Sequence, residues 1–300
     1  MIPSRVTVVE VGPRDGLQNE GAAISTADKI AFVNRLSAAV PPVIEVASFV
    51  SPRRVPQMAD ATEVFAGIDR RPEIRYSALV PNLTGLLRAH AAGVREVALV
   101  AASSESFSQR NINQTIAASL EQYREVCARA QELDMRVRGY LSTAFGCPFE
   151  GDVAPARVAE IAAALIEMGT FEVAISDTIG IAHPGQVPRV VAAVAERVPL
   201  EQIALHFHDT RGTALANVLT ALELGVDTFD ASCGGLGGCP YAPGATGNLA
   251  TEDLVYMLDG LNIESGVQLH ALLEASSFIE SRVGHLLPSR FYRASAARST

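Results

Sequence analysis

The feature that most constrains the fold is an alternation of short β-branched segments with longer amphipathic ones. Eight short runs have the composition of buried strands, and each is followed by apolar residues at helical spacing. This repeated alternation predicts the α/β class and, with eight units, a (β/α)8 TIM barrel. The predicted strands are Val6–Val11, Val43–Ala47, Arg75–Val80, Glu96–Ala101, Arg136–Thr143, Phe171–Ser176, Ile203–His208 and Val226–Ala231.

A doubly wound open sheet is the alternative architecture, because it shows the same alternation. Two observations favour the barrel: no GxGxxG follows the first strand, and polar residues follow many different strands, where a barrel has its active site. Extra C-terminal helices are predicted around Leu249–Leu261 and Val267–Val283. We therefore expect a single barrel domain over residues 1–285. Because periodicity is lost after Leu286, residues 286–300 are expected to form a flexible tail.

Charge and composition exclude several classes of partner. The formal net charge is -9, and no Lys/Arg stripe is present, so nucleic acid is not an expected partner. No apolar stretch approaches the roughly 20 residues that cross a bilayer, and the first residues do not resemble a signal peptide. The four cysteines form no CxxC pair, which argues against a structural zinc site. We expect a cytoplasmic protein without a membrane partner, and a homo-oligomer, specifically a dimer.

The basic residues restrict the chemistry, because Lys29 is the one lysine among 24 Lys+Arg. Imine-forming aldolases and pyridoxal-phosphate enzymes need a lysine amine at the reacting centre. In a barrel that amine projects from a strand end, whereas Lys29 falls in a predicted helix. Carbon–carbon bond chemistry in this chain therefore needs another electron sink.

The strongest motif is His206-Phe-His208 at the end of the seventh predicted strand. Residues i and i+2 of a strand point to the same face, so both imidazoles are expected in the barrel mouth. Barrel closure brings strands one, seven and eight together, and with them Asp15 and Asn248. Two nitrogens and two oxygens suit Mg2+ or Mn2+ better than structural zinc. The alternative is a pair of hydrogen-bonded histidines in a polar layer.

Two further charged residues are candidates for the site: the basic Arg14, next to Asp15, and the acidic Glu45. Arg14 and Asp15 occur in a Gly/Pro-punctuated loop that a surface turn explains equally well. Glu45 lies inside an apolar strand, where a carboxylate needs a partner such as Arg14 or the metal shell; a core salt bridge is the alternative.

The segment Gly234–Asn248 has six glycines and two prolines around Cys239. Glycine adopts backbone conformations that other residues avoid, so such a loop is suited to act as a lid over a barrel mouth. A thiol exchanges a proton near neutral pH, so Cys239 is a candidate general acid or base. A tight turn with a small apolar filler is the alternative.

These segments together resemble the hydroxymethylglutaryl-CoA lyase family. The resemblance rests on VEVGPRDGLQNE, IEVASFVSPRRVPQMAD, HFHDTRGTALAN and GGLGGCPYAPGATGNLATEDLVYML, and it extends from about Val6 to about Ile279. It implies a metal-dependent (β/α)8 barrel that cleaves 3-hydroxy-3-methylglutaryl-CoA to acetyl-CoA and acetoacetate, in leucine catabolism and ketone-body formation. The implied partner is an acyl-CoA substrate, and the implied cofactor is Mg2+ or Mn2+.

The resemblance also implies roles for individual residues. Asp15, His206, His208 and Asn248 correspond to metal ligands. Cys239, Arg14, Glu45 and Asp15 correspond to catalytic residues, and Arg14, Gln18, Ser48 and Thr178 correspond to substrate-binding residues. Whether Asp15 or Cys239 is the initial base stays open.

Four other functions are alternatives to this one. A lyase for a related 3-hydroxyacyl-CoA needs the same residues. A Claisen-type synthase of the same barrel group is expected to carry a regulatory domain, for which 300 residues leave no room. An HxH amidohydrolase is expected to carry its histidines on the first strand, which has none. A non-catalytic barrel that binds metal or acyl-CoA differs only in lacking turnover.

Overall fold

The strands of this protein close into a single parallel barrel in the order β1 to β8, with β8 pairing back onto β1. The structure is a computed structural model that describes residues 1–238 and 247–297. The predicted (β/α)8 TIM barrel is therefore confirmed. The strands are β1 (Thr7–Glu10), β2 (Val43–Ser48), β3 (Arg75–Leu79), β4 (Glu96–Ala102), β5 (Arg136–Ser142), β6 (Glu172–Asp177), β7 (Ile203–Phe207) and β8 (Thr228–Ala231).

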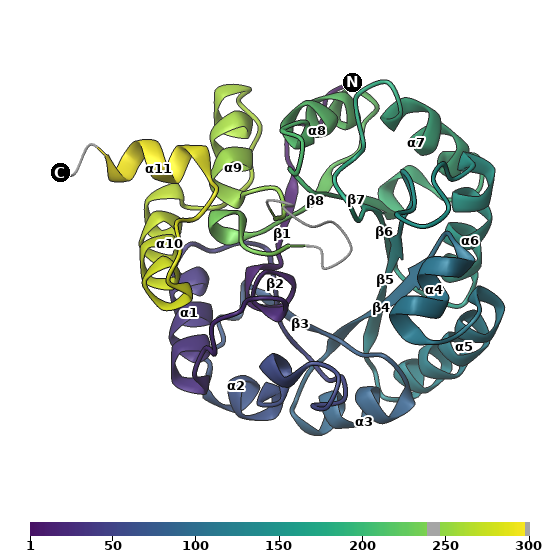
Figure 1. Ribbon diagram of the computed structural model, residues 1–300, viewed down its shortest axis with the longest axis horizontal. Helices are drawn as coiled ribbons and strands as arrows, with labels where there is room; N and C mark the ends of the chain where they lie inside the picture. The colour runs from purple at the N-terminus through teal and green to yellow at the C-terminus, as the bar shows by residue number, and fades with distance from the viewer. Residues whose placement is uncertain (239–246, 298–300) are drawn as a thin grey trace.

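Helices surround this barrel as an outer ring (Figure 1). Helix α7 shows why they pack there: Val187, Val190, Val191 and Val194 follow the i, i+3, i+4, i+7 pattern, and all four are buried. The helices between the strands are α1 (Thr26–Ala38), α2 (Ala61–Gly67), α3 (Leu83–Ala91), α4 (Glu105–Ile112), α5 (Ile116–Glu132), α6 (Pro155–Glu167), α7 (Val187–Ala195) and α8 (Ala214–Glu223). Short helical turns are η1 (Gly12–Gly16), η2 (Pro56–Met58), η3 (Leu200–Gln202) and η4 (Cys233–Gly235).

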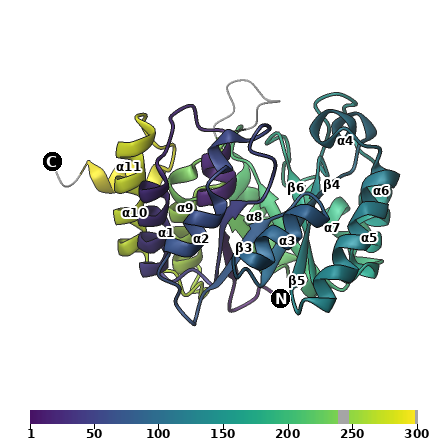
Figure 2. The same ribbon diagram turned by 90° about the horizontal axis from the view of Figure 1, so that it is seen from below.

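Three helices follow the barrel: α9 (Thr251–Gly260), α10 (Leu269–Val283) and α11 (Arg290–Ala296). Figure 2 shows α10 and α11 beside α1 at one side of the barrel. The first two were predicted. The expectation of irregular structure from residue 286 onward is wrong for α11, whose Tyr292 is buried.

Tertiary contacts explain this last helix. Asp253 of α9 accepts hydrogen bonds from Ser289 Oγ at 2.9 Å and from Phe291 N at 2.7 Å. Ser289 Oγ in turn accepts from Tyr292 N at 3.2 Å, as a helix cap. The carboxylate that anchors α11 is 36 residues away from Ser289 in sequence. Local periodicity therefore does not indicate this contact.

No helix in the described part of the chain has both the length and the apolar composition needed to cross a membrane. Parallel strands direct their carboxyl ends to one face of the barrel, and the loops at that face carry the polar motifs of the sequence. That face is where the candidate site lies.

Candidate active site

The turn after β1 places Arg14 and Asp15 at the barrel mouth. The carbonyl oxygen of Val11 accepts hydrogen bonds from the backbone N–H groups of Arg14, Asp15 and Gly16 at 2.8–3.2 Å. A Cβ at position 12 would lie 2.6 Å from Glu10 Oε1, so any other residue there would displace the Glu10 carboxylate. The Gly12-Pro13 pair thus belongs to a tight turn that also presents two functional side chains.

Arg14 is held between two carboxylates. Its Nε donates to Glu45 Oε2 and its Nη1 to Asp15 Oδ1, each at 2.5 Å, so Nη2 lies outside both ion pairs. Burial opposes the charge of Arg14, but Glu45 and Asp15 outweigh burial and raise the pKa of the guanidinium above its ordinary value. The buried Glu45 on β2 therefore has the partner that its apolar strand requires.

Asp15, His206 and His208 form a cluster that can hold a metal ion, because one ligand atom from each lies within 4.8 Å of the others. His206 is the last residue but one of β7, and His208 directly follows that strand. Burial alone would raise the pKa of Asp15, but Arg14 and the two histidines lower it to about 2. The carboxylate is therefore ionised at neutral pH.

Asn248 completes this cluster from the segment that returns after β8. Leu249 N donates to Phe207 O at 3.0 Å, so the segment runs beside the end of β7. Asn248 Nδ2 donates to Asp15 Oδ2 at 2.9 Å and to Leu236 O at 3.0 Å. Asn248 Oδ1 and His208 Nδ1 are buried without a hydrogen-bond partner in the described part of the chain.

These two unsatisfied atoms are an observation in favour of a bound cation. A buried lone pair without a partner is costly, and a metal ion satisfies it. The donor set, a carboxylate, an amide oxygen and two imidazoles, suits a hard or borderline divalent cation. Burial and the neighbouring His206 lower the pKa of His208 to about 4, so His208 is neutral, as a metal ligand must be.

The predicted substrate residues lie around the same mouth but are not part of the cluster. Ser48 ends β2 and is fully buried, and its Oγ has no hydrogen-bond partner among residues 1–238 and 247–297. Thr178 directly follows β6, and its Oγ1 accepts from Thr143 N at 2.7 Å. Gln18 lies just beyond η1 and is partly buried. Cys239 lies outside the described residues.

Sequence reasoning missed a second polar group inside the barrel, below the metal cluster. Asp230 on β8 contacts His206, and Arg138 on β5 contacts Asp230. Tyr140 on β5 lies between them and Arg14: its hydroxyl donates to Glu45 Oε2 at 3.4 Å, and both guanidiniums lie over its ring. The available signal was a charged residue within an apolar strand, the same signal that pointed to Glu45.

Two more buried carboxylates support the base of the glycine-rich segment. Glu10 Oε1 accepts from the backbone N–H groups of Gly12 and Cys233, and its Oε2 accepts from Thr251 Oγ1 at 2.6 Å. Glu252 accepts from Gly234 N at 2.8 Å. Burial raises the pKa of both carboxyls to about 7. They join the turn after β1 to η4, where the glycine-rich segment begins.

Lys29 is remote from this chemistry. Its Nζ forms an ion pair with Asp60 at 2.7 Å and donates to the carbonyl of Gln57, within the helix and loop layer outside the barrel. The prediction that Lys29 lies in a helix and not at a strand end is confirmed.

A closed parallel barrel with one carboxylate and two histidines at the carboxyl ends of its strands defines a candidate metal-dependent TIM-barrel enzyme. Residues 5–279 match the HMGL-like family model, so the chain belongs to the HMGL-like family. It is 53% identical over 298 residues to the 3-hydroxy-3-isohexenylglutaryl-CoA/hydroxy-methylglutaryl-CoA lyase of Pseudomonas aeruginosa, with 99% of each chain covered.

Two solved structures extend the comparison. The hydroxymethylglutaryl-CoA lyase from Pseudomonas aeruginosa has a TM-score of 0.97 at 53% identity, with 99% of each chain covered. An HMG-CoA lyase from Acinetobacter baumannii, solved in complex with coenzyme A and 3-methylmalate, has a TM-score of 0.93 at 42% identity, covering 97% of this chain and 95% of that one.

Proposed function

We propose that this protein is a lyase that cleaves 3-hydroxy-3-methylglutaryl-CoA to acetyl-CoA and acetoacetate by a retro-Claisen step. The observation that carries the proposal is the Asp15, His206 and His208 cluster with Arg14 directly beside it. Family membership and relatives of this name, matched over nearly the whole chain, support the same reaction.

The cleavage is difficult because negative charge appears on the departing thioester enolate. Asp15, His206, His208 and Asn248 would hold a divalent cation, Mg2+ or Mn2+. When bound, that cation supplies Lewis acidity that acidifies the tertiary hydroxyl of the substrate. The unsatisfied Asn248 Oδ1 and His208 Nδ1 support this ligand set.

Arg14 is suited to stabilise the enolate oxygen. It keeps its charge, and Nη2 lies outside its two ion pairs, so this nitrogen can donate to a substrate oxygen. Glu45 holds the guanidinium in place through Nε. A preorganised donor of this kind costs no reorganisation when charge develops, and removing one typically lowers the rate by about 10²–10³.

The proton steps involve Asp15 and Cys239. Either the Asp15 carboxylate or the Cys239 thiolate removes the hydroxyl proton, and Cys239 then delivers a proton to the enolate carbon. Gln18, Ser48 and Thr178 would line the acyl pocket. The buried hydroxyl of Ser48 has no hydrogen-bond partner among residues 1–238 and 247–297, and a substrate oxygen in contact with it would supply one.

The acyl group is the open part of the substrate assignment. The Pseudomonas aeruginosa relative carries two substrate names, one with a methyl and one with an isohexenyl substituent. A lyase for a related 3-hydroxyacyl-CoA is therefore the second candidate. We further propose the cytoplasm as its location, a homodimer as its assembly and a place in leucine catabolism.

One assay tests the reaction. Purified protein is mixed with 3-hydroxy-3-methylglutaryl-CoA and Mg2+ or Mn2+, and acetoacetate release is measured with and without a chelator. We expect metal-dependent release. Binding of CoA thioesters without turnover at saturating metal would instead identify a non-catalytic binding barrel. Comparing kcat/KM for 3-hydroxyacyl-CoA substrates with methyl and isohexenyl substituents then separates the two acyl candidates.

A further inference from the structure

A buried charge pair, Arg138 and Asp230, lies beneath the metal cluster. Asp230 lies on β8 directly opposite His206 in the strand register. Its side chain is completely buried, and Oδ2 lies 3.0 Å from His206 Nδ1. A carboxylate at this distance is a hydrogen-bond partner of the imidazole at Nδ1.

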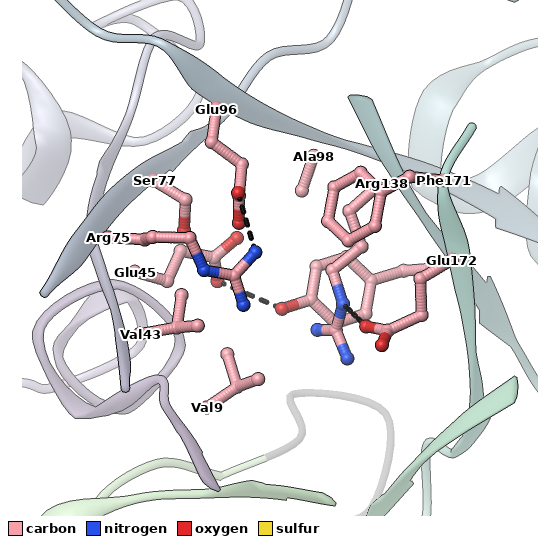
Figure 3. A pocket seen from close by; sticks show the side chains of 11 residues that line it. Val9, Val43, Glu45, Arg75, Ser77, Glu96, Ala98, Arg138, Phe171 and Glu172 are labelled. Carbon is pink, nitrogen blue, oxygen red and sulfur yellow. Dashed lines mark hydrogen bonds and ion pairs between the residues drawn. The ribbon is translucent and has the colours of Figure 1, made fainter. Parts of the chain in front are cut away.

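Asp230 is itself held from the far side of the barrel. Arg138 Nη2 forms a 2.9 Å ion pair with Asp230 Oδ1, and Arg138 Nε donates to Glu172 Oε1 at 2.6 Å. Arg138 and Asp230 are both buried. Figure 3 shows Arg138 and Glu172 side by side on the wall of a pocket that Glu45 also lines.

The chemistry of imidazole gives this chain of contacts a consequence. A neutral imidazole has one N–H donor and one lone pair, and the partner of one nitrogen determines which nitrogen carries the proton. An ionised Asp230 only accepts, so the proton belongs on His206 Nδ1. The lone pair is then on Nε2, the nitrogen left for a cation.

His208 provides an internal contrast. Its Nδ1 is buried and has no hydrogen-bond partner in the described part of the chain, so no carboxylate determines its tautomer. Of the two histidines of the cluster, only His206 has a buried acidic partner among the described residues. That partner, Asp230, is in turn paired with Arg138.

We propose that Asp230, held by Arg138, is a positioning residue that presets His206 as the Nδ1–H tautomer with Nε2 free for the cation. Carboxylate partners of this kind orient metal-bound histidines and raise their basicity in many proteins. The functional consequence rests on the proposed metal site, whereas the tautomer itself is a property of the metal-free protein.

A purely structural explanation predicts a different outcome. If the Arg138–Asp230 pair only filled the core, any loss of a buried carboxylate in this layer would have a similar effect. Glu172 provides the matched control, because it contacts the same guanidinium but has no contact with His206 in the described residues.

The test combines two variants and two readouts. Asp230→Asn and Glu172→Gln each replace a carboxylate by an amide of the same shape. The His206 tautomer is read by long-range 15N–1H NMR in metal-free protein, with the resonance assigned by its loss in His206→Gln. Burial opposes protonation of His206, but Asp230 and Asp15 outweigh burial and raise its pKa, so the spectra are recorded above that pKa, where the imidazole is neutral. Mn2+ affinity is then measured by isothermal titration calorimetry.

The wild type should show the Nδ1–H tautomer. Asp230→Asn should populate the Nε2–H tautomer and weaken Mn2+ binding by about 10- to 100-fold, the range typical of such partners. Glu172→Gln should retain the Nδ1–H tautomer and stay within about threefold of wild-type affinity. An Nε2–H tautomer in the wild type overturns the proposal without recourse to any variant, as does equal weakening by both substitutions.

Failure of the proposed metal site would look different. In that case the wild type would bind no Mn2+ while the tautomer still changed between wild type and Asp230→Asn. The two results therefore separate an error in the positioning residue from an error in the function.

Discussion

Asn248 Nδ2 lies 2.9 Å from Asp15 Oδ2, which joins the turn after the first strand to the segment that returns after the eighth. The donor is Nδ2, so this contact does not use the amide oxygen of Asn248, which has no hydrogen-bond partner among the described residues. A residue 233 positions away in sequence thus orients the carboxylate at the centre of the candidate site. The site exists only when the barrel is closed.

Removing one imidazole tests the ligand assignment. His208→Ala should weaken Mn2+ binding by at least about 10-fold, because a ligand contributes no less than its supporting partners do. Calorimetry with Mn2+ measures the effect. His270→Ala, whose side chain is 91% exposed on α10, is the control and should bind as the wild type does. Unchanged affinity in His208→Ala would contradict the assignment.

Replacing the guanidinium of Arg14 by an ammonium group tests its role in stabilising the enolate oxygen. Arg14→Lys keeps the charge but cannot contact Glu45 and Asp15 through two separate nitrogens while a third faces the substrate. We expect kcat to fall by about 10²–10³, with Mn2+ affinity little changed. Steady-state kinetics measure kcat and KM, and Arg35→Lys on exposed α1 is the matched control. A rise in KM with kcat unchanged would assign Arg14 to uniform substrate binding instead.

The thiol of Cys239 is tested by a single-atom change. Cys239→Ser should abolish most turnover and leave Mn2+ binding nearly intact, because a hydroxyl exchanges its proton far less readily than a thiol. Cys127→Ala on α5 is the control, since burial raises the pKa of Cys127 to about 11 and keeps it protonated. A near-normal rate in Cys239→Ser would remove the thiol from the mechanism.

Buried Glu10 predicts how stability depends on pH. Burial raises its pKa from 4.5 to about 7, so between these values the folded state holds a proton that the unfolded state has released. Stability therefore falls as pH rises through this window, by about 3 kcal/mol at most. Glu10→Gln removes this titration and preserves the contacts, because the amide can donate to Thr251 Oγ1 while its oxygen accepts from Gly12 and Cys233.

Urea unfolding at pH 5, 6, 7 and 8 measures this effect. The stability of Glu10→Gln relative to the wild type should increase with pH and level off above about pH 7. Exposed Glu63→Gln on α2 should show a constant difference. A constant difference for Glu10→Gln as well would mean that the carboxyl of Glu10 ionises normally in the folded protein.

Local pattern was enough to predict several parts of this protein. The β-branched runs and the helical apolar spacing predicted all eight strands, because those periods report which face of each element is buried. The polar residues that follow many different strands favoured a closed barrel over an open sheet. The i, i+2 spacing of His206 and His208 placed both on one face of a strand. The position of Lys29 in a helix excluded imine chemistry.

Tertiary structure alone decided the rest, because those contacts join residues that are far apart in the chain. The 36-residue separation between Asp253 and Ser289 hid helix α11 from sequence reasoning. Asp230 and Arg138 meet across the interior of the barrel, so neither strand by itself indicates that one supports His206. Periodicity determines which way a side chain faces, whereas only the closed barrel determines what it meets there.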